Sequence, residues 1–134
     1  MGQIGAVEIH PSDPDIIYVA AIGQPFMKSE ERGLYKSIDG GDSWEKILFL
    51  SDSIGIVDIE FAPDDPNTIY AASWRAERKP WTIISGSTNG GAYKSDDAGV
   101  TWKKINLGID TKYIGKIDFA VSKSEPDRLF VMVE

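Results

Sequence analysis

A chain of 134 residues has room for one domain of ordinary size, or for part of a larger one. With 42% hydrophobic and 26% charged residues it has the composition of a folded globular protein, and its formal net charge of −7 without a basic cluster argues against a nucleic-acid partner. The absence of cysteine excludes disulfides and thiolate nucleophiles, and the single histidine excludes the common histidine-rich metal sites, so we expect neither a metal nor a cofactor.

The first 50 residues predict four short strands joined by turns. Val7 and Ile9 alternate with other residues at the period of two that is typical of a strand. The segment Asp13-Pro14-Asp15 predicts a turn, because proline fixes φ and aspartate can bond neighbouring backbone groups. The strands that follow are rich in β-branched and aromatic residues, and we place them at 16–21, 33–38 and 43–50.

The same order of signals returns further along the chain. The turn recurs as Asp65-Pro66-Asn67 and as Glu125-Pro126-Asp127, at offsets of 65 − 13 = 52 and 125 − 65 = 60 residues. The stretch 33–44 recurs at 91–102, an offset of 91 − 33 = 58. The corresponding strands are expected around Val57, Ile59 and Phe61, over 68–74, 91–96 and 101–107, around Ile117, Phe119 and Val121, and over 128–133.

Tandem units of four antiparallel strands, each roughly 50 to 60 residues long, are typical of β-propeller blades. We therefore predict an all-β chain that forms a partial propeller of about two and a half four-stranded blades, with units at residues 4–50, 54–107 and 114–134. A closed propeller needs about four to eight blades, so the expected partners are the remaining blades of a longer chain or further copies of this one. A β-sandwich built from the same strands is the alternative fold.

Two eight-residue segments join the third and fourth predicted strands of the first two units. Both fit the pattern Ser-x-Asp-x-Gly-x-(Ser/Thr)-Trp. The carboxylate and hydroxyl groups can bond the loop backbone, the glycine can adopt a positive φ, and the tryptophan can anchor the turn on its sheet. We predict a structural role for these residues, which are Ser37, Asp39, Gly41, Ser43 and Trp44 in the first unit and Ser95, Asp97, Gly99, Thr101 and Trp102 in the second. Calcium binding is the alternative, but the alternating oxygen ligands and terminal glutamate of a calcium loop are missing.

At these residues the chain resembles the Asp-box repeat propellers, also called BNR propellers, which include sialidases, xyloglucanase-type glycoside hydrolases, sortilin-type receptor domains and photosystem II assembly factors. It looks most like the large bacterial sortilin-like propeller proteins often named as glycosyl hydrolases, through the stretches 32–37, 70–75 with 81–82, and 92–95. The resemblance implies a propeller of more blades and suggests a secreted or periplasmic location. It implies no activity, because Asp-boxes lie on the blade periphery in enzymes and non-enzymes alike.

The sequence itself leaves the compartment open. No stretch approaches 18 apolar residues, so no membrane-spanning segment is expected. Residues 1–9 lack the basic start and the long apolar run of a signal peptide. A secreted protein need not contain disulfides, so the absence of cysteine does not decide the question.

Two loops are expected on the rim opposite the Asp-box turns, because a four-strand meander places the connections between its second and third strands there. They are residues 23–32 and the longer 75–90, and long loops on a regular scaffold are where binding residues usually lie. The second loop, with the residue before it, contributes two flat rings and two cations suited to stacking on a sugar or holding a carboxylate, from Trp74, Arg75, Arg78 and Trp81. The structural alternative is that both tryptophans pack the loop against a neighbouring blade while the cations lie in solvent.

Asp58 and Asp118 occupy one register, 60 residues apart, on the strands expected to line the propeller axis. A glycosidase needs two facing carboxylates, which makes these residues weak candidates for a catalytic pair. In the first unit the same position is held by Glu8 or Ala6, depending on where a two-residue gap falls. A residue repeated in successive blades is explained more simply by the scaffold.

The leading hypothesis is therefore a non-catalytic propeller segment that acts as scaffold and binding rim for a protein, peptide or glycan ligand. The alternative is part of a glycoside hydrolase of the sialidase or xyloglucanase type, with catalytic residues partly outside this chain. Purely structural blades without a ligand are a third possibility.

Overall fold

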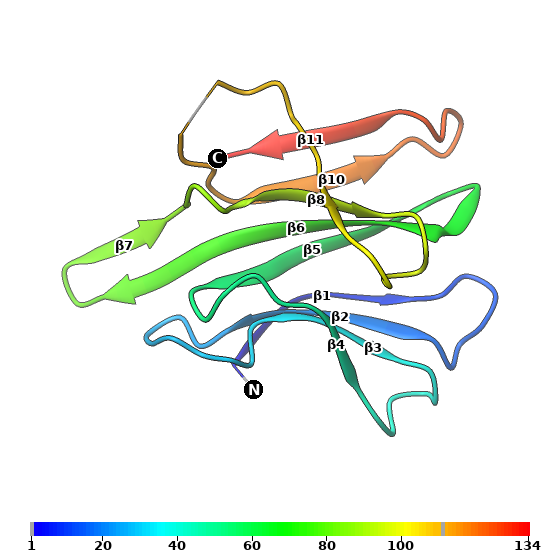
Figure 1. The fold of residues 1–134 in the computed structure, drawn as a ribbon, viewed down its shortest axis with the longest axis horizontal. Coiled ribbons are helices and arrows are strands. Elements are labelled where there is room, and N and C mark those ends of the chain that lie inside the picture. Colours follow the sequence, from blue (N-terminus) through cyan, green and yellow to red (C-terminus); the bar gives the residue numbers. More distant parts are fainter. Residues whose placement is uncertain (1, 111) are drawn as a thin grey trace.

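The computed structural model describes residues 2–110 and 112–134, in which eleven β-strands form three antiparallel sheets (Figure 1). Sheet 1 has the order β1-β2-β3-β4, from β1 (Gln3–Ile9), β2 (Ile17–Gly23), β3 (Gly33–Ser37) and β4 (Glu45–Leu48). Sheet 2 has the order β5-β6-β8-β9, with β7 paired to β6, from β5 (Ile54–Ala62), β6 (Asp65–Lys79), β7 (Thr82–Ser85), β8 (Gly91–Ser95) and β9 (Lys103–Lys104). Sheet 3 pairs β10 (Ile117–Val121) with β11 (Leu129–Val133). The described residues contain no helix that is long and apolar enough to cross a membrane.

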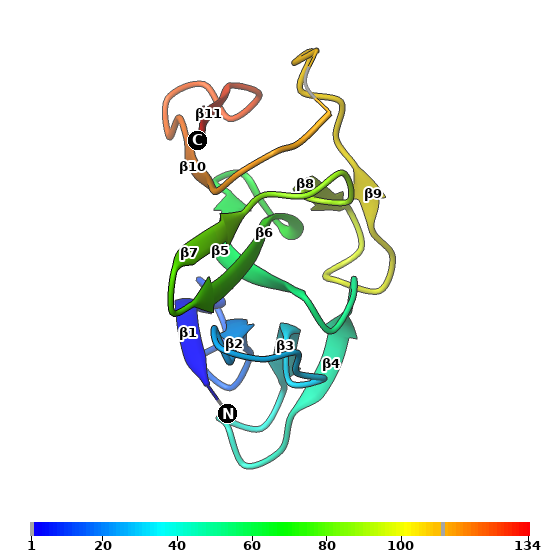
Figure 2. The same cartoon turned by 90° about the vertical axis from the view of Figure 1, so that its left-hand side faces the viewer.

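The three sheets are stacked in chain order, with β1, β5 and β10 on the same side of the stack (Figure 2). β5 contacts β1, β2 and β3 of sheet 1 and also contacts β10 of sheet 3. The registers repeat as well, since Val7 pairs with Val19, Ile59 with Ala71 and Phe119 with Val131. The all-β prediction is confirmed, and the sequence offsets of 52 and 60 residues correspond to equivalent positions in adjacent sheets.

The interface between sheets 1 and 2 is apolar and closely packed. Its buried cluster contains residues from both sheets, namely Tyr18, Ala20, Leu34, Leu48, Ile56, Ile59, Ile69 and Ala71, with Tyr93 and Trp102 packed against it. A second cluster joins sheets 2 and 3 through Val57, Ala72, Ala92, Ile117 and Phe119. The backbones also approach closely, because a Cβ added at Gly55 would lie 2.6 Å from the Cα of Ile22. Burial of these side chains is the main source of stability in such a stack.

Sheet 1 has one uncovered apolar face, which lines a shallow groove through Ile4, Val7, Val19, Tyr35 and Trp44. Adding the repeat offsets of 52 or 58 residues to these positions gives Ile56, Ile59, Ala71, Tyr93 and Trp102, which face sheet 1 from sheet 2. Trp44 is accordingly 43% exposed, whereas Trp102 packs against the buried cluster. The uncovered face of sheet 1 therefore carries apolar residues at the positions equivalent to those with which sheet 2 packs on sheet 1.

The longest predicted loop is largely a hairpin, which corrects the sequence prediction. β6 runs for 15 residues to Lys79 and pairs with β7 through residues 76–85, so only 86–90 remain as a connection to β8. Alternation of apolar and charged residues over 74–77 and the run Thr82-Ile83-Ile84 carried this signal, but the charged and proline residues at 78–80 favoured a loop. The fourth strands are also shorter than predicted, spanning Glu45–Leu48 and Lys103–Lys104.

Candidate functional site

The connections between strands lie on two opposite rims of the stack. The β1–β2, β3–β4 and β10–β11 turns lie on the right of Figure 1, and the β2–β3 loop and the β6–β7 hairpin lie on the left. We call these the turn rim and the loop rim. The division follows from the antiparallel order of the strands and separates the two Ser-x-Asp-x-Gly-x-(Ser/Thr)-Trp turns from the predicted ligand residues.

Each of the two turns on the turn rim is held by a network of its own side chains. In the first, the Ser37 hydroxyl donates to Asp39 Oδ1 at 2.7 Å, and Asp39 accepts the backbone N–H of Ser43 at 2.9 Å and its hydroxyl at 2.5 Å. The Trp44 ring N–H donates to the Gly41 carbonyl at 3.0 Å. Gly41 has φ of 99°, a conformation that favours glycine.

The second turn reproduces this network with Ser95, Asp97, Thr101 and Trp102. Hydrogen bonds from Thr101 and Ser95 lower the pKa of Asp97 to about 2, and those from Ser43 and Ser37 do the same for Asp39. Both carboxylates are therefore ionised acceptors whose partners lie inside the turn, which leaves little capacity for an external ligand.

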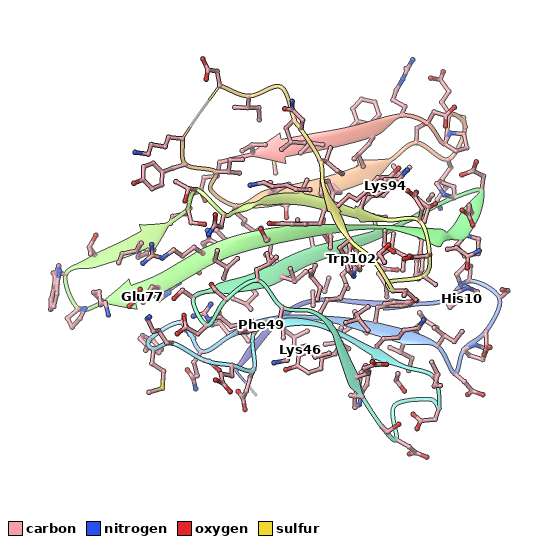
Figure 3. The ribbon with its side chains drawn as sticks, in the orientation of Figure 1. His10, Lys46, Phe49, Glu77, Lys94 and Trp102 are labelled. Carbon is pink, nitrogen blue, oxygen red and sulfur yellow. The ribbon has the colours of Figure 1, made fainter. Side chains whose placement is uncertain are left out.

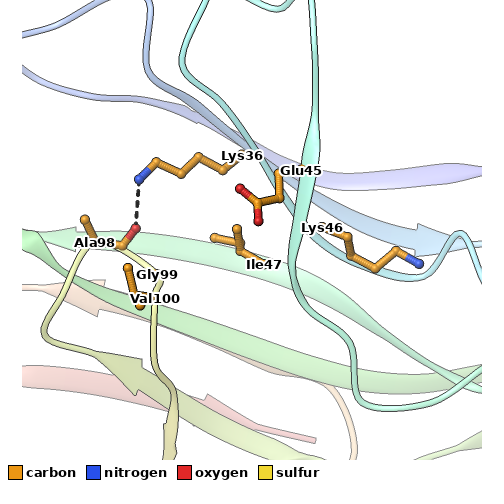
Figure 4. Close-up of a pocket in the computed structure, with 7 residues that line it drawn as sticks. All are labelled: Lys36, Glu45, Lys46, Ile47, Ala98, Gly99 and Val100. Atoms are coloured by element: carbon orange, nitrogen blue, oxygen red, sulfur yellow. Dashed lines mark hydrogen bonds between the residues drawn. The ribbon is translucent and has the colours of Figure 1, made fainter.

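The second turn also contacts the neighbouring sheet. The Ala98 carbonyl accepts hydrogen bonds from the Tyr18 hydroxyl at 3.1 Å and from Lys36 Nζ at 3.0 Å, both in sheet 1. Figure 4 shows the Lys36 bond across a groove that is also lined by Ile47 and Gly99. Ala98 is the one described non-glycine residue with positive φ, at 56°, so this turn holds a costly backbone conformation where it meets sheet 1.

On the loop rim, the β6–β7 hairpin separates the four predicted ligand residues. Trp74 lies at its base, where it is partly buried and its ring N–H donates to the Ser85 hydroxyl at 2.9 Å. Trp81 lies at the tip and is 81% exposed. The five residue-to-residue steps of strand from Trp74 to Lys79 span roughly 17 Å at the usual rise, so the two rings do not form one stacking platform.

The charged side chains of the hairpin include one internal cluster. Glu77 lies 2.5 Å from Lys79 Nζ and 3.7 Å from the Arg75 guanidinium, and Lys79 is the largest cause of a lowered Glu77 pKa. Figure 3 shows Glu77 on the projecting hairpin. Arg78 is exposed and, because side chains alternate along a strand, points to the face opposite Glu77 and Lys79. Of the four predicted ligand residues, Trp81 and Arg78 are therefore the two that remain accessible near the tip.

Arg32 organises the other half of the loop rim, and sequence reasoning missed this role. Its side chain is 1% exposed, and its guanidinium donates to the carbonyls of Ile22 at 2.7 Å, Gln24 at 2.5 Å, and Met27 and Ala76 at 3.3 Å. The last bond joins the 23–32 loop to β6, as does the bond from the Arg78 N–H to the Pro25 carbonyl at 2.6 Å. The matching feature in the sequence is Gly23, nine residues earlier. A side chain at this position would clash with Arg32, because a Cβ there would lie 2.6 Å from the Arg32 stem.

The weak catalytic candidates lie on β5 and β10, the first strands of sheets 2 and 3, and both have structural partners. Asp58 accepts the backbone N–H of Phe119 at 2.8 Å, which ties sheet 2 to sheet 3, and Asp118 forms an ion pair with Lys116 at 3.2 Å. Asp58 pairs with Ala72 and Ala6 with Ala20, one repeat apart, so Ala6 and not Glu8 holds the equivalent position in sheet 1.

Two further carboxyl groups lie on the first strands of sheets 1 and 2, Glu8 on β1 and Glu60 on β5. Burial, followed by repulsion from Asp58, raises the pKa of both Glu8 and Glu60. Across the described ranges, no three His, Asp or Glu side chains are grouped so that they could hold a metal ion.

Comparisons with known proteins identify similar folds without assigning a family. No family model matches the chain, and no curated protein matches it. Among solved structures, an ancestral GH74 enzyme matches at 18% sequence identity with a TM-score of 0.66, covering 96% of this chain and 16% of that one. The Niastella koreensis GH74 enzyme matches at 23% identity with a TM-score of 0.65, covering 96% of this chain and 17% of that one.

These likenesses define the class of fold. The chain has the sheet arrangement of a β-propeller segment, similar to that of propeller-type glycoside hydrolases. It spans about a sixth of the length of either enzyme. At such identity the likeness concerns the fold, since one fold hosts many functions.

Proposed function

We propose that the chain is a segment of a β-propeller in which each sheet is one blade, and that its loop rim binds a carbohydrate without catalysing its hydrolysis. The observation that carries the proposal is Trp81, 81% exposed at the tip of a projecting hairpin that also carries the exposed Arg78 three residues earlier. A large exposed ring costs free energy in water and gains by stacking on the apolar face of a sugar, while a guanidinium can bind hydroxyl or carboxylate groups. The two similar solved structures are GH74 enzymes, which are propeller-type glycoside hydrolases, and this likeness favours a sugar over other ligands.

The rim is built as a firm support for such a ligand. Arg32 and the Arg78 backbone join the 23–32 loop to the base of the hairpin, and the Trp74 ring bonds Ser85 across the hairpin. Phe26 and Met27 are 67% and 61% exposed on the joined loop and are further apolar side chains of the loop rim. A rim of this kind orders few groups on binding, which limits the entropy lost.

The role of Asp58 and Asp118 supports the non-catalytic assignment. Asp58 is committed to a backbone N–H of the neighbouring sheet, and Asp118 is neutralised by Lys116. A retaining or inverting pair needs one protonated and one ionised carboxyl group facing a common space. Structural partners of this kind favour a scaffold role for both residues.

Isothermal titration of the intact chain with soluble gluco-, xylo- and manno-oligosaccharides tests the proposal. We expect one of these sugar classes to bind, Trp81→Ala to abolish the binding heat, and Trp81→Phe to retain part of it. Ile83→Ala, which removes another exposed apolar side chain from the hairpin, serves as the matched control and is expected to bind normally. Absence of binding by every sugar, or unchanged binding by Trp81→Ala, would reject the proposal.

Membership of a glycoside hydrolase, with catalytic groups partly outside this chain, is the second candidate, and the fold of the two GH74 structures favours it. Release of reducing ends by a longer chain that includes these residues would support it. If that activity survives in both Asp58→Asn and Asp118→Asn, the two carboxylates are not its catalysts.

A further inference from the structure

The charged residues of the chain are divided unevenly between its two rims. On the turn rim, the segments 10–16, 38–45 and 62–68 include the β1–β2, β3–β4 and β5–β6 turns (Figure 1). Together these three segments contain seven carboxylates and no lysine or arginine. The formal net charge of the whole chain is −7, so the turn rim alone carries as much negative charge as the protein does in total.

The β6–β7 hairpin on the loop rim has the opposite charge. Residues 74–85 contain three cations, Arg75, Arg78 and Lys79, and one carboxylate, Glu77. Arg75 and Lys79 share that carboxylate, since both form ion pairs with it. Arg78 is exposed and forms no ion pair among the residues that the structure describes. The hairpin therefore presents one guanidinium to solvent whose charge is not compensated.

The backbone holds this guanidinium close to the exposed ring at the tip. Lys79 and Thr82 are the last cross-strand pair before the tip, and Arg78 lies one residue before Lys79. The Arg78 N–H donates to the Pro25 carbonyl at 2.6 Å, which fixes this part of β6 against the neighbouring loop. At about 3.3 Å for each residue of strand, the Cα of Arg78 lies roughly 7 Å from the tip, a distance that a long arginine side chain can span.

A sugar ring stacked on Trp81 would therefore hold its substituents within reach of the Arg78 cation. A guanidinium has a planar fork of N–H donors that matches a carboxylate, and such charge-assisted hydrogen bonds are roughly twice as strong as neutral ones. The hydroxyl groups of a neutral sugar would leave the cation without a counter-charge. A hexuronic acid combines the two groups that this rim can bind, because its ring retains an apolar face and its sixth carbon is a carboxylate.

We propose that the loop rim binds acidic polysaccharides built from uronic acids, with a sugar ring stacked on Trp81 and a carboxylate hydrogen-bonded by Arg78. This inference rests on the proposed function and narrows it from carbohydrates in general to anionic ones. The acidic turn rim repels the same polyanion, so the field of the protein turns the loop rim towards the ligand before contact. The three carboxylate-rich turns thus favour one orientation of binding without touching the sugar.

Calorimetric titration of the full 134-residue chain with oligogalacturonate, oligoglucuronate and oligomannuronate, each compared with its methyl ester, tests the proposal. Esterification keeps the sugar ring and removes the charge of the carboxylate. We expect at least one of the acids to bind about tenfold more tightly than its ester, as expected for one charge-assisted hydrogen-bonded pair. The difference should shrink as the salt concentration is raised, because both charges are exposed to solvent.

Arg78→Gln should lower the affinity for the acid to that for its ester and leave the affinity for the ester unchanged. Arg128→Gln is the matched control, because it removes an exposed arginine from the turn rim with the same change in net charge. It should leave both affinities unchanged. Trp81→Ala should abolish the binding of acid and ester alike, since both stack on the same ring.

The outcomes separate this inference from the proposed function on which it rests. If neutral sugars and methyl esters bind as tightly as the acids, or if the preference for the acid persists in Arg78→Gln, the inference is overturned and the proposed function stands. Unchanged binding of the acids by Trp81→Ala would also overturn it, because the attraction would then not involve the stacking ring. If no sugar binds, whether charged or neutral, both are rejected.

Discussion

Replacement of Arg32 by methionine should destabilise the protein and loosen the loop rim. The guanidinium is 1% exposed and donates to four carbonyls, two of them at 2.7 and 2.5 Å. Methionine fills much of the space of the arginine stem but donates no hydrogen bond. The carbonyls of Ile22 and Gln24 would then be left without their present partner.

The size of the effect follows from two opposing contributions. Each of the two carbonyls left unsatisfied costs roughly 1–3 kcal/mol, and the two longer bonds add less. Burial lowers the pKa of Arg32, so the cation is held here at some cost in desolvation, which methionine avoids. We expect a net loss of about 2–4 kcal/mol in the free energy of unfolding, or roughly 3–5 °C in Tm for each kcal/mol.

Urea denaturation gives the global effect, and limited trypsin digestion gives the local one. Cleavage after Lys28, in the middle of the loop, should accelerate more than cleavage elsewhere in Arg32→Met. Arg78→Met provides the control, because that side chain is exposed and should change stability by less than about 0.5 kcal/mol. If the free energy of unfolding of Arg32→Met lies within about 0.5 kcal/mol of that of the parent, and cleavage after Lys28 is unchanged, the role given to this guanidinium is refuted.

Three further predictions concern the turns, the sheet interface and the uncovered face. The pKa of Asp97 is about 2 because Thr101 and Ser95 bond the ionised form, so its stabilising effect is complete above the unfolded value of about 3.9 and is lost as pH falls towards 2. The difference in urea midpoint between the parent and Asp97→Asn should therefore shrink over that pH window, and a constant difference would contradict the pKa. Gly55→Ala should lower the free energy of unfolding by about 2 kcal/mol or more in thermal melts, since its Cβ would lie 2.6 Å from the Ile22 backbone; an unchanged Tm would show that the sheets can separate freely. The uncovered apolar face of sheet 1 should make the chain associate as its concentration rises. Val7→Lys should reduce that association in light scattering, because Val7 lines the apolar groove of this face, whereas Val100→Lys, exposed but outside that groove, should not. Equal association of both variants would place the contact elsewhere.

The strands and their order could be predicted because the signals for them are local. Alternation around Val7, the Asp-Pro-Asp turn and the recurring Gly-x-Tyr-Lys-Ser stretch each depend on a few consecutive residues. The same is true of the two turns between third and fourth strands, because the bonds of the serine, aspartate and tryptophan side chains of the pattern in each turn join residues within five positions of one another. The repeat offsets then predicted which positions are equivalent in neighbouring sheets.

The sequence could not predict which groups meet across sheets or loops, because those contacts depend on the stacking. The Ala98 carbonyl lies 80 residues from Tyr18, and the Ala76 carbonyl lies 44 residues from Arg32. Trp74 and Trp81 are close in sequence but lie at opposite ends of a hairpin, because an extended strand separates residues by about 3.3 Å each. Sequence alone therefore determined the repeating strands and self-contained turns, while tertiary structure decided which residues are accessible on the loop rim and which carbonyl each donor reaches, because burial and long-range hydrogen bonds exist only once the sheets have stacked.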